Sequence, residues 1–325
     1  METKVQLARK YGADCFHLHS YFSGTDHAGD PSKVIATVSH RNTEELKLVR
    51  QAYCALYNQD ILHLLSQKNS LFARVVYLRV SEPHERDAEI VRGALFGSSL
   101  DLDTLTEVIC TRPSAGLRIV REAYRSRYMS DLDEDVSFKI NGSSLKEVLL
   151  AVLKSCRYAG ARVEAGMAMC DAKTLYEAIE SGKHVDQRSI VSILGQRSTD
   201  QMKAILCSYR ELYGHDFLKF LKKDKCGAFG KQLRVVVRCI QSPEKQLAKR
   251  LRRALMNSDA REALIRIVVT RSEIDIERIN GAFTAKSRWS LDGVIRNEFN
   301  NNSTSHTERD YNLVGDVLVA LLKHY

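Results

Sequence analysis

The chain has 325 residues, a formal net charge of +9, 44% hydrophobic residues, 27% charged residues and only 4 prolines. This composition excludes a disordered, collagen-like or proline-rich chain, and the length suffices for several modules of a helix-rich globular protein. The longest apolar runs, such as those at 148–153 and 317–322, are far shorter than the roughly 20 residues that a membrane-spanning helix needs. The start of the chain lacks the apolar core of a secretory signal and the 8 cysteines form no C-x-x-C pair, so we expect a cytoplasmic protein with neither a zinc site nor a disulfide framework.

Along the chain an arginine recurs, and the same apolar pattern surrounds it each time. The four arginines are Arg41, Arg112, Arg197 and Arg271. Apolar or aromatic residues stand seven positions before and five, eight and twelve positions after each one: Val34, Leu46, Val49 and Tyr53; Leu105, Leu117, Val120 and Tyr124; Ile190, Met202, Ile205 and Tyr209; Leu264, Ile276, Ile279 and Phe283. Steps of 5, 8 and 12 positions fall on one stripe of an α-helix, so each copy is expected to carry the same amphipathic helix with the same buried face.

The repeat predicts an all-α chain of four modules of about 70 residues each, with several short helices in each module. We place these modules at 13–80, 84–156, 168–240 and 244–322 and number them one to four. Pro83 and Pro243 stand at equivalent places and predict helix starts. No alternation typical of β-strands recurs with turn residues, which favours the all-α prediction.

These repeated segments resemble the annexin family, and plant annexins in particular. The segments that carry the resemblance are IATVSHRNTEELKLVRQAYCALY at 35–57, EPHERDA at 82–88, EVICTRPSAGLRIVREAYRSRY at 107–128, the stretch at 193–213, and LIRIVVTRSEIDI at 264–276. The resemblance implies a curved disc of four repeats with five helices each. It also implies peripheral binding to anionic phospholipid through calcium ions that are held in loops, without enzymatic activity.

The family's calcium sites combine a glycine-rich loop after the first helix of a repeat with a carboxylate 27 positions after the anchoring arginine. That position holds Lys68, Lys139, Asp224 and Glu298 in modules one to four. Calcium prefers six to eight oxygen ligands, and a lysine puts a positive charge where the ion would lie. The resemblance therefore implies calcium sites that are weak or partial.

The candidate calcium ligands come from three modules. They are Gly24 and Gly29 in module one, Gly182 and Asp224 in module three, and Met256, Ser258 and Glu298 in module four. Glycine matters in such loops because converging carbonyl groups need backbone conformations that side chains disfavour. We expect module four to hold the best remaining site, although its loop has lost both glycines.

Positive charge is concentrated in one stretch, residues 219–253, which we call the basic segment. It holds twelve lysines and arginines against two acids, Asp224 and Glu244. Within it Lys245, Lys249, Arg252 and Arg253 share one predicted helix face, opposite leucines at 247, 251 and 255. We expect this face to bind anionic lipid with reduced dependence on calcium. Calcium-independent binding of anionic lipid or nucleic acid through the basic segment is the alternative, with nucleic acid the less favoured partner.

Smaller signals have both an ordinary structural explanation and a functional one. His40 lies where plant annexins have a debated haem or peroxidase region, so a haem-dependent enzyme is a third possibility. Cys110 and Cys239 match a cysteine pair proposed as redox-active in plant relatives, although buried core thiols are the simpler interpretation. The sequence at 265–267, Ile-Arg-Ile, matches a motif offered for actin binding. The motif makes actin a further possible partner, and self-association is a separate possibility.

Overall fold

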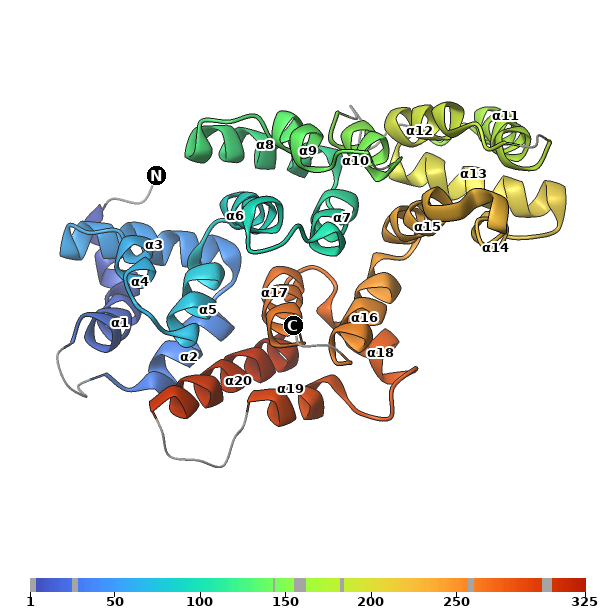
Figure 1. Ribbon diagram of the computed structural model, residues 1–325. Coiled ribbons are helices and arrows are strands. Elements are labelled where there is room, and N and C mark those ends of the chain that lie inside the picture. Colours follow the sequence, from blue (N-terminus) through green and yellow to red (C-terminus); the bar gives the residue numbers. More distant parts are fainter. Residues whose placement is uncertain are drawn as a thin grey trace. The chain divides into compact units, whose positions relative to one another are not determined.

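The computed structural model describes residues 4–24, 29–142, 144–154, 162–181, 184–256, 260–299 and 306–325 (Figure 1). Within these residues all the regular structure is helical. Five α-helices overlap the range predicted for each module, and the first and last of them extend beyond that range in several modules. The all-α prediction is confirmed. None of the helices in these ranges has both the length and the apolar character needed to cross a bilayer.

The helices follow one another in the same order in each module. Module one contains α1 (Lys4–Ser23), α2 (Pro31–His40), α3 (Thr43–Tyr57), α4 (Ile61–Ser66) and α5 (Leu71–Val80). Module two contains α6 (Pro83–Phe96), α7 (Leu102–Thr111), α8 (Ser114–Tyr128), α9 (Leu132–Lys139) and α10 (Ser144–Lys154). The proline at the start of α6 begins a helix, as predicted.

Modules three and four repeat this order. Module three contains α11 (Ala165–Tyr176), the π-helix η1 (Glu177–Ser181), α12 (Gln187–Gln196), α13 (Thr199–Tyr213), α14 (Phe217–Phe220), the 3-10 helix η2 (Asp224–Cys226) and α15 (Gly227–Gln241). Module four contains α16 (Pro243–Ala254), α17 (Ala260–Arg271), α18 (Ile276–Thr284), α19 (Leu291–Phe299) and α20 (His306–His324). Here too a predicted helix start, Pro243, is confirmed.

The sixteen apolar positions of the repeat are all buried. None of them is more than 3% exposed, including the aromatic column Tyr53, Tyr124, Tyr209 and Phe283, which is 0% exposed in every module. The stripe therefore faces a core in each copy. This burial explains why the same residue types recur at the same spacing.

The repeated arginine stands at the C-terminal end of the second helix of each module and forms an ion pair. In the first three modules its partner is an aspartate from the first helix: Arg41 with Asp14 at 3.1 Å, Arg112 with Asp87 at 2.5 Å, and Arg197 with Asp171 at 2.5 Å. In module four the partner is instead Asp275, four residues further on, at 2.6 Å from Arg271. The ion pair thus connects the end of the second helix to the first helix in modules one to three. In module four it connects the end of α17 to the start of α18.

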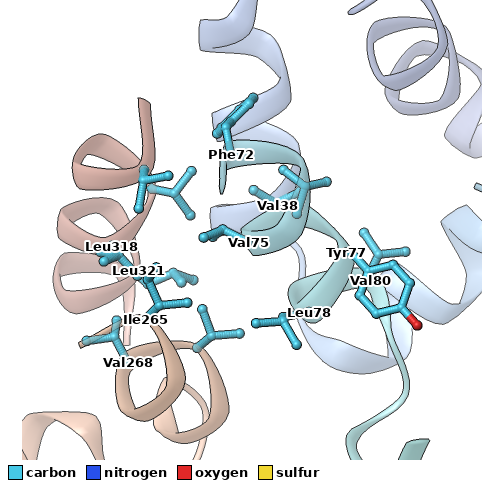
Figure 2. Packing of buried hydrophobic residues seen from close by; sticks show 14 of the residues in the cluster. Val38, Phe72, Val75, Tyr77, Leu78, Val80, Ile265, Val268, Leu318 and Leu321 are labelled. Carbon is cyan, nitrogen blue, oxygen red and sulfur yellow. The ribbon is translucent and has the colours of Figure 1, made fainter. Parts of the chain in front are cut away.

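The chain divides into two compact units. The first comprises Met1–Pro83 and Leu247–Tyr325, and the second comprises His84–Gln246. In the first unit, α5, α17 and α20 bury one shared core, and Figure 2 shows Val75, Ile265 and Leu318 meeting there. The two ends of the sequence, modules one and four, therefore fold together, while modules two and three share the second core.

Candidate calcium loops and basic surface

In modules one to three, the loop between the first two helices ends in an aspartate that caps the second helix. Asp30, Asp101 and Asp186 accept hydrogen bonds from the backbone N–H groups of Ser32, Thr104 and Ser189 at 2.9, 2.9 and 3.3 Å. Hydrogen bonds from the neighbouring serines lower the pKa of Asp30 and Asp186. These three carboxylates serve as helix caps.

In module one, the two predicted glycines lie on either side of residues outside the described ranges. Gly24 directly follows α1. Gly29 packs so closely on α1 that an added Cβ atom would lie 2.5 Å from the Cα of Tyr21, which explains why glycine stands there. Lys68 is exposed in the turn between α4 and α5, so a cation occupies the position of the carboxylate.

Module two shows the clearest departure from a calcium site. The Nζ atom of Lys139 lies 4.4 Å from the centroid of the Phe96 ring, at the point where α6 ends and the loop begins. The guanidinium of Arg92 lies 3.7 Å from the centroid of the same ring. Two cations therefore contact one aromatic ring through cation–π interactions beside this loop.

In module three, Asp224 begins the short helix η2 and is exposed. It stands between Lys223 and Lys225, both exposed, and the Nζ of Lys223 lies 3.5 Å from the centroid of Phe220. The other candidate of this module, Gly182, lies outside the described residues. The flanking lysines weaken the attraction of Asp224 for a dication.

In module four, Glu298 lies in the last turn of α19. Its backbone carbonyl accepts a hydrogen bond from the Nε of Arg261 at 2.9 Å, and the guanidinium of Arg261 lies 4.6 Å from the centroid of Tyr311. Met256, after α16, is 87% exposed. Ser258 lies outside the described residues. Arg261, which is not among the residues predicted from the sequence, brings a cation to the residue that retains the carboxylate.

The described residues at the predicted calcium positions of modules two, three and four fit calcium poorly. Module two, whose loop at 97–101 is described throughout, does not fit the ion, because Lys139 and Arg92 bring positive charge to it. Modules three and four each retain one carboxylate at the predicted position, with cations close to it. In the described ranges, no three side chains among histidine, cysteine, aspartate and glutamate come together as a possible metal cluster.

The predicted lipid-binding residues all lie on α16. Lys245, Lys249 and Arg253 are exposed, while the face with Leu247 and Leu251 is buried. Arg252 is partly buried: its guanidinium donates a hydrogen bond to the carbonyl of Ala282 at 3.2 Å, and burial lowers its pKa.

The last turns of α16 form a basic depression on the surface. Lys249, Arg252, Arg253 and Met256 line it together. Three cations and one exposed apolar side chain therefore share a small surface. This combination of positive charge and an apolar tip suits an interface that has both anionic headgroups and acyl chains.

The smaller candidates lie in different surroundings. His40 is exposed at the end of α2, and the centroid of its ring lies 5.1 Å from that of His324. Cys110 and Cys239 are 5% and 3% exposed, on the contacting helices α7 and α15. The Ile-Arg-Ile sequence at 265–267 is buried in α17, with exposures of 1%, 5% and 0%. Burial gives a redox reagent or an actin filament little access, and the haem, redox and actin roles stay predictions.

The comparisons with known proteins agree with this arrangement. The Annexin family model matches residues 86–152, 170–236 and 246–305, which fall in modules two, three and four. The chain is 33% identical to Annexin D6 of Arabidopsis thaliana over 315 residues, covering 96% of this chain and 94% of the relative. It is 36% identical to Annexin Gh1 of Gossypium hirsutum over 284 residues, covering 87% and 89%.

Solved structures give the same result for the fold. Annexin III superposes with a TM-score of 0.83 at 25% identity, covering 95% of this chain and 94% of that chain. Apo-annexin (Sm)1 superposes with a TM-score of 0.78 at 21% identity, covering 94% and 90%. The family model, together with the relatives at 33% and 36% identity, shows that the chain belongs to the annexin family.

Proposed function

We propose that this protein binds anionic phospholipid membranes peripherally, from the cytoplasm, with reduced dependence on calcium. Annexins in general bind phospholipid in a calcium-dependent way. The observation that supports a reduced dependence on calcium is the position of Lys139. Its Nζ atom lies 4.4 Å from the centroid of the Phe96 ring, beside the loop of module two. A protein cation at that place can attract a lipid phosphate directly.

The basic depression on α16 supplies the direct attraction. Each lysine or arginine near an anionic leaflet contributes about 1 kcal/mol, and salt screens this contribution. Lys249, Arg252 and Arg253 would then provide roughly 3 kcal/mol together, less whatever Arg252 loses through its partial burial. Met256, which is 87% exposed, adds apolar surface that the interface can bury.

We retain module four as the place of the best remaining calcium site. Glu298, Met256 and Ser258 are the candidate ligands there. Asp224 and Gly182 in module three and Gly24 and Gly29 in module one are weaker candidates. When bound, the ion would supply a bridge between protein oxygens and lipid phosphate.

Isothermal titration with calcium, with and without phosphatidylserine vesicles, tests this proposal. We compare the wild type with Glu298→Gln, and use Glu122→Gln, an exposed residue of α8, as the control. A weak calcium signal that only Glu298→Gln reduces, together with vesicle binding in EGTA, supports the proposal. Tight calcium binding that is strictly required for vesicle binding contradicts it.

A further inference from the structure

We propose that His40 and His324 together form a binding site for a divalent transition metal ion such as Ni²⁺. The two imidazoles come from opposite ends of the sequence, and both are exposed. Their ring centroids are 5.1 Å apart and their planes are inclined by 62°. The neutral imidazole nitrogen is the most common protein ligand for such ions.

The separation of the rings matches that of two imidazoles bound to one ion. A metal–nitrogen bond of about 2.0–2.1 Å puts the ion about 3.2 Å from each ring centroid. Two imidazoles on one ion at angles between 90° and 109° then have centroids about 4.5–5.2 Å apart. The observed 5.1 Å lies in this range. Both side chains are exposed, so their rings can turn toward a common ion, although the His324 ring then gives up part of its edge contact with the Tyr325 ring, whose centroid lies 4.7 Å away.

The same distance argues against a haem held between the two rings. Imidazoles on opposite sides of a haem iron lie about 6.4 Å apart from centroid to centroid, again with about 3.2 Å from the iron to each ring. The pair is thus better suited to a small ion, bound from one side.

The backbone holds the two residues in place. His40 is the last residue of α2 and directly follows the buried residues Val38 and Ser39. His324 is the last residue of α20, three positions after the fully buried Leu321. The two helices pack against each other within one unit. The pair therefore does not depend on a mobile loop.

The local electrostatics permit a cation. Both histidines end an α-helix, and the negative end of a helix dipole favours positive charge. The nearest cationic neighbours in sequence are Arg41 and Lys323. Arg41 is paired with Asp14 and Glu45 at 3.1 and 3.3 Å, which offsets its charge. Water molecules would complete the coordination of the ion.

The test is equilibrium titration of the full chain with NiCl2 in a non-chelating buffer. The protein is first alkylated, because the exposed cysteines Cys54, Cys170 and Cys207 also bind metals. The variants are His40→Gln and His324→Gln. His63→Gln, which removes an exposed histidine of α4, is the matched control.

We expect one Ni²⁺ ion per chain, with affinity at least about tenfold lower in either variant and unchanged in the control. A Ni²⁺ concentration that just saturates the wild type should raise the Tm of the wild type and of His63→Gln by clearly more than that of the two variants. If His40→Gln disturbs α2, as judged by circular dichroism, His324→Gln at the end of α20 carries the test. Wild-type affinity in His324→Gln, or equal weakening in His63→Gln, overturns the proposal.

Discussion

At the scale of single residues, Arg261 bears most directly on calcium binding. Its Nε donates a hydrogen bond to the carbonyl of Glu298, the one residue of module four that retains the expected carboxylate. Replacement by Gln should remove the positive charge and raise the calcium affinity of this module several-fold, because like charges no longer repel. Calcium titration of Arg261→Gln checks this prediction.

Arg296→Gln is the control for that experiment, since Arg296 is an exposed cation on the same helix as Glu298. Like Arg261→Gln, it removes one positive charge, but it leaves the hydrogen bond between Arg261 and the carbonyl of Glu298 in place. If both substitutions raise calcium affinity equally, the effect is one of general charge and the role assigned to Arg261 is wrong.

Single residues also show how far the sequence could predict the site. The register of the repeat identifies Lys139 as the residue in the place of a carboxylate. It does not reveal that Lys139 contacts Phe96 together with Arg92, because those two residues lie on another helix. Arg261 could have been found from the same register, as a cation at the start of α17. His324 could not, because nothing in the local pattern connects it with His40.

At the scale of elements, α16 carries the surface that we expect to meet the membrane. The double substitution Lys249→Glu and Arg253→Glu reverses two charges on this helix without changing its buried leucines. At about 1 kcal/mol for each cation lost, it should weaken binding to phosphatidylserine vesicles in EGTA by at least about thirtyfold. Sedimentation at several vesicle concentrations measures the change.

A matched control reverses two charges elsewhere. Lys173 on α11 and Arg210 on α13 are exposed, so Lys173→Glu with Arg210→Glu gives the same change in net charge. An equal loss of binding in this control would show that overall charge, and not the surface of α16, is responsible.

Most helices of the chain could be predicted from the sequence, because the apolar stripe and the prolines are local signals. All sixteen positions of the stripe are buried, and α6 and α16 begin at the expected prolines. The partner of the repeated arginine could not be predicted in module four. Arg271 pairs with Asp275 there, whereas the other modules use an aspartate of the first helix.

At the scale of the whole molecule, the repeat pattern does not say which modules share a core. Modules one and four are joined by Arg79, whose side chain is 1% exposed and lies 2.6 Å from Glu273. Glu273 also accepts hydrogen bonds from the N–H and hydroxyl groups of Thr43 at 3.0 and 2.9 Å. These long-range contacts depend on the folded chain, so local sequence patterns cannot reveal them.

Glu273→Gln should destabilise the first unit by about 3 kcal/mol, because it leaves the buried Arg79 without its charged partner. Urea unfolding measures the loss, and hydrogen exchange should locate it in α2, α5 and α17. Glu122→Gln, which breaks the exposed pair of Glu122 with Arg118, should cost less than about 1 kcal/mol. Equal costs for the two substitutions would rule out a special role for Glu273.

The same carboxylate makes the stability of this unit depend on pH. Burial favours a higher pKa for Glu273, but the hydrogen bonds of Thr43 and the charge of Arg79 outweigh burial and lower its pKa. Because the pKa of Glu273 is lowered in the folded state, this carboxylate stabilises the fold at pH values above its ordinary pKa of 4.5. The stabilisation is lost as the pH falls from 4.5 through the lowered pKa. Glu273→Gln should therefore show a weaker loss of stability on acidification than the wild type.

The most direct test of reduced calcium dependence is sedimentation of the wild-type protein with phosphatidylserine vesicles, in EGTA and in calcium, at low and high salt. We predict that a substantial fraction binds in EGTA at low salt, that salt releases it, and that calcium adds only modestly to the binding. Binding that appears only with calcium would contradict the account, and would return the calcium loops to the central role that they have in other annexins.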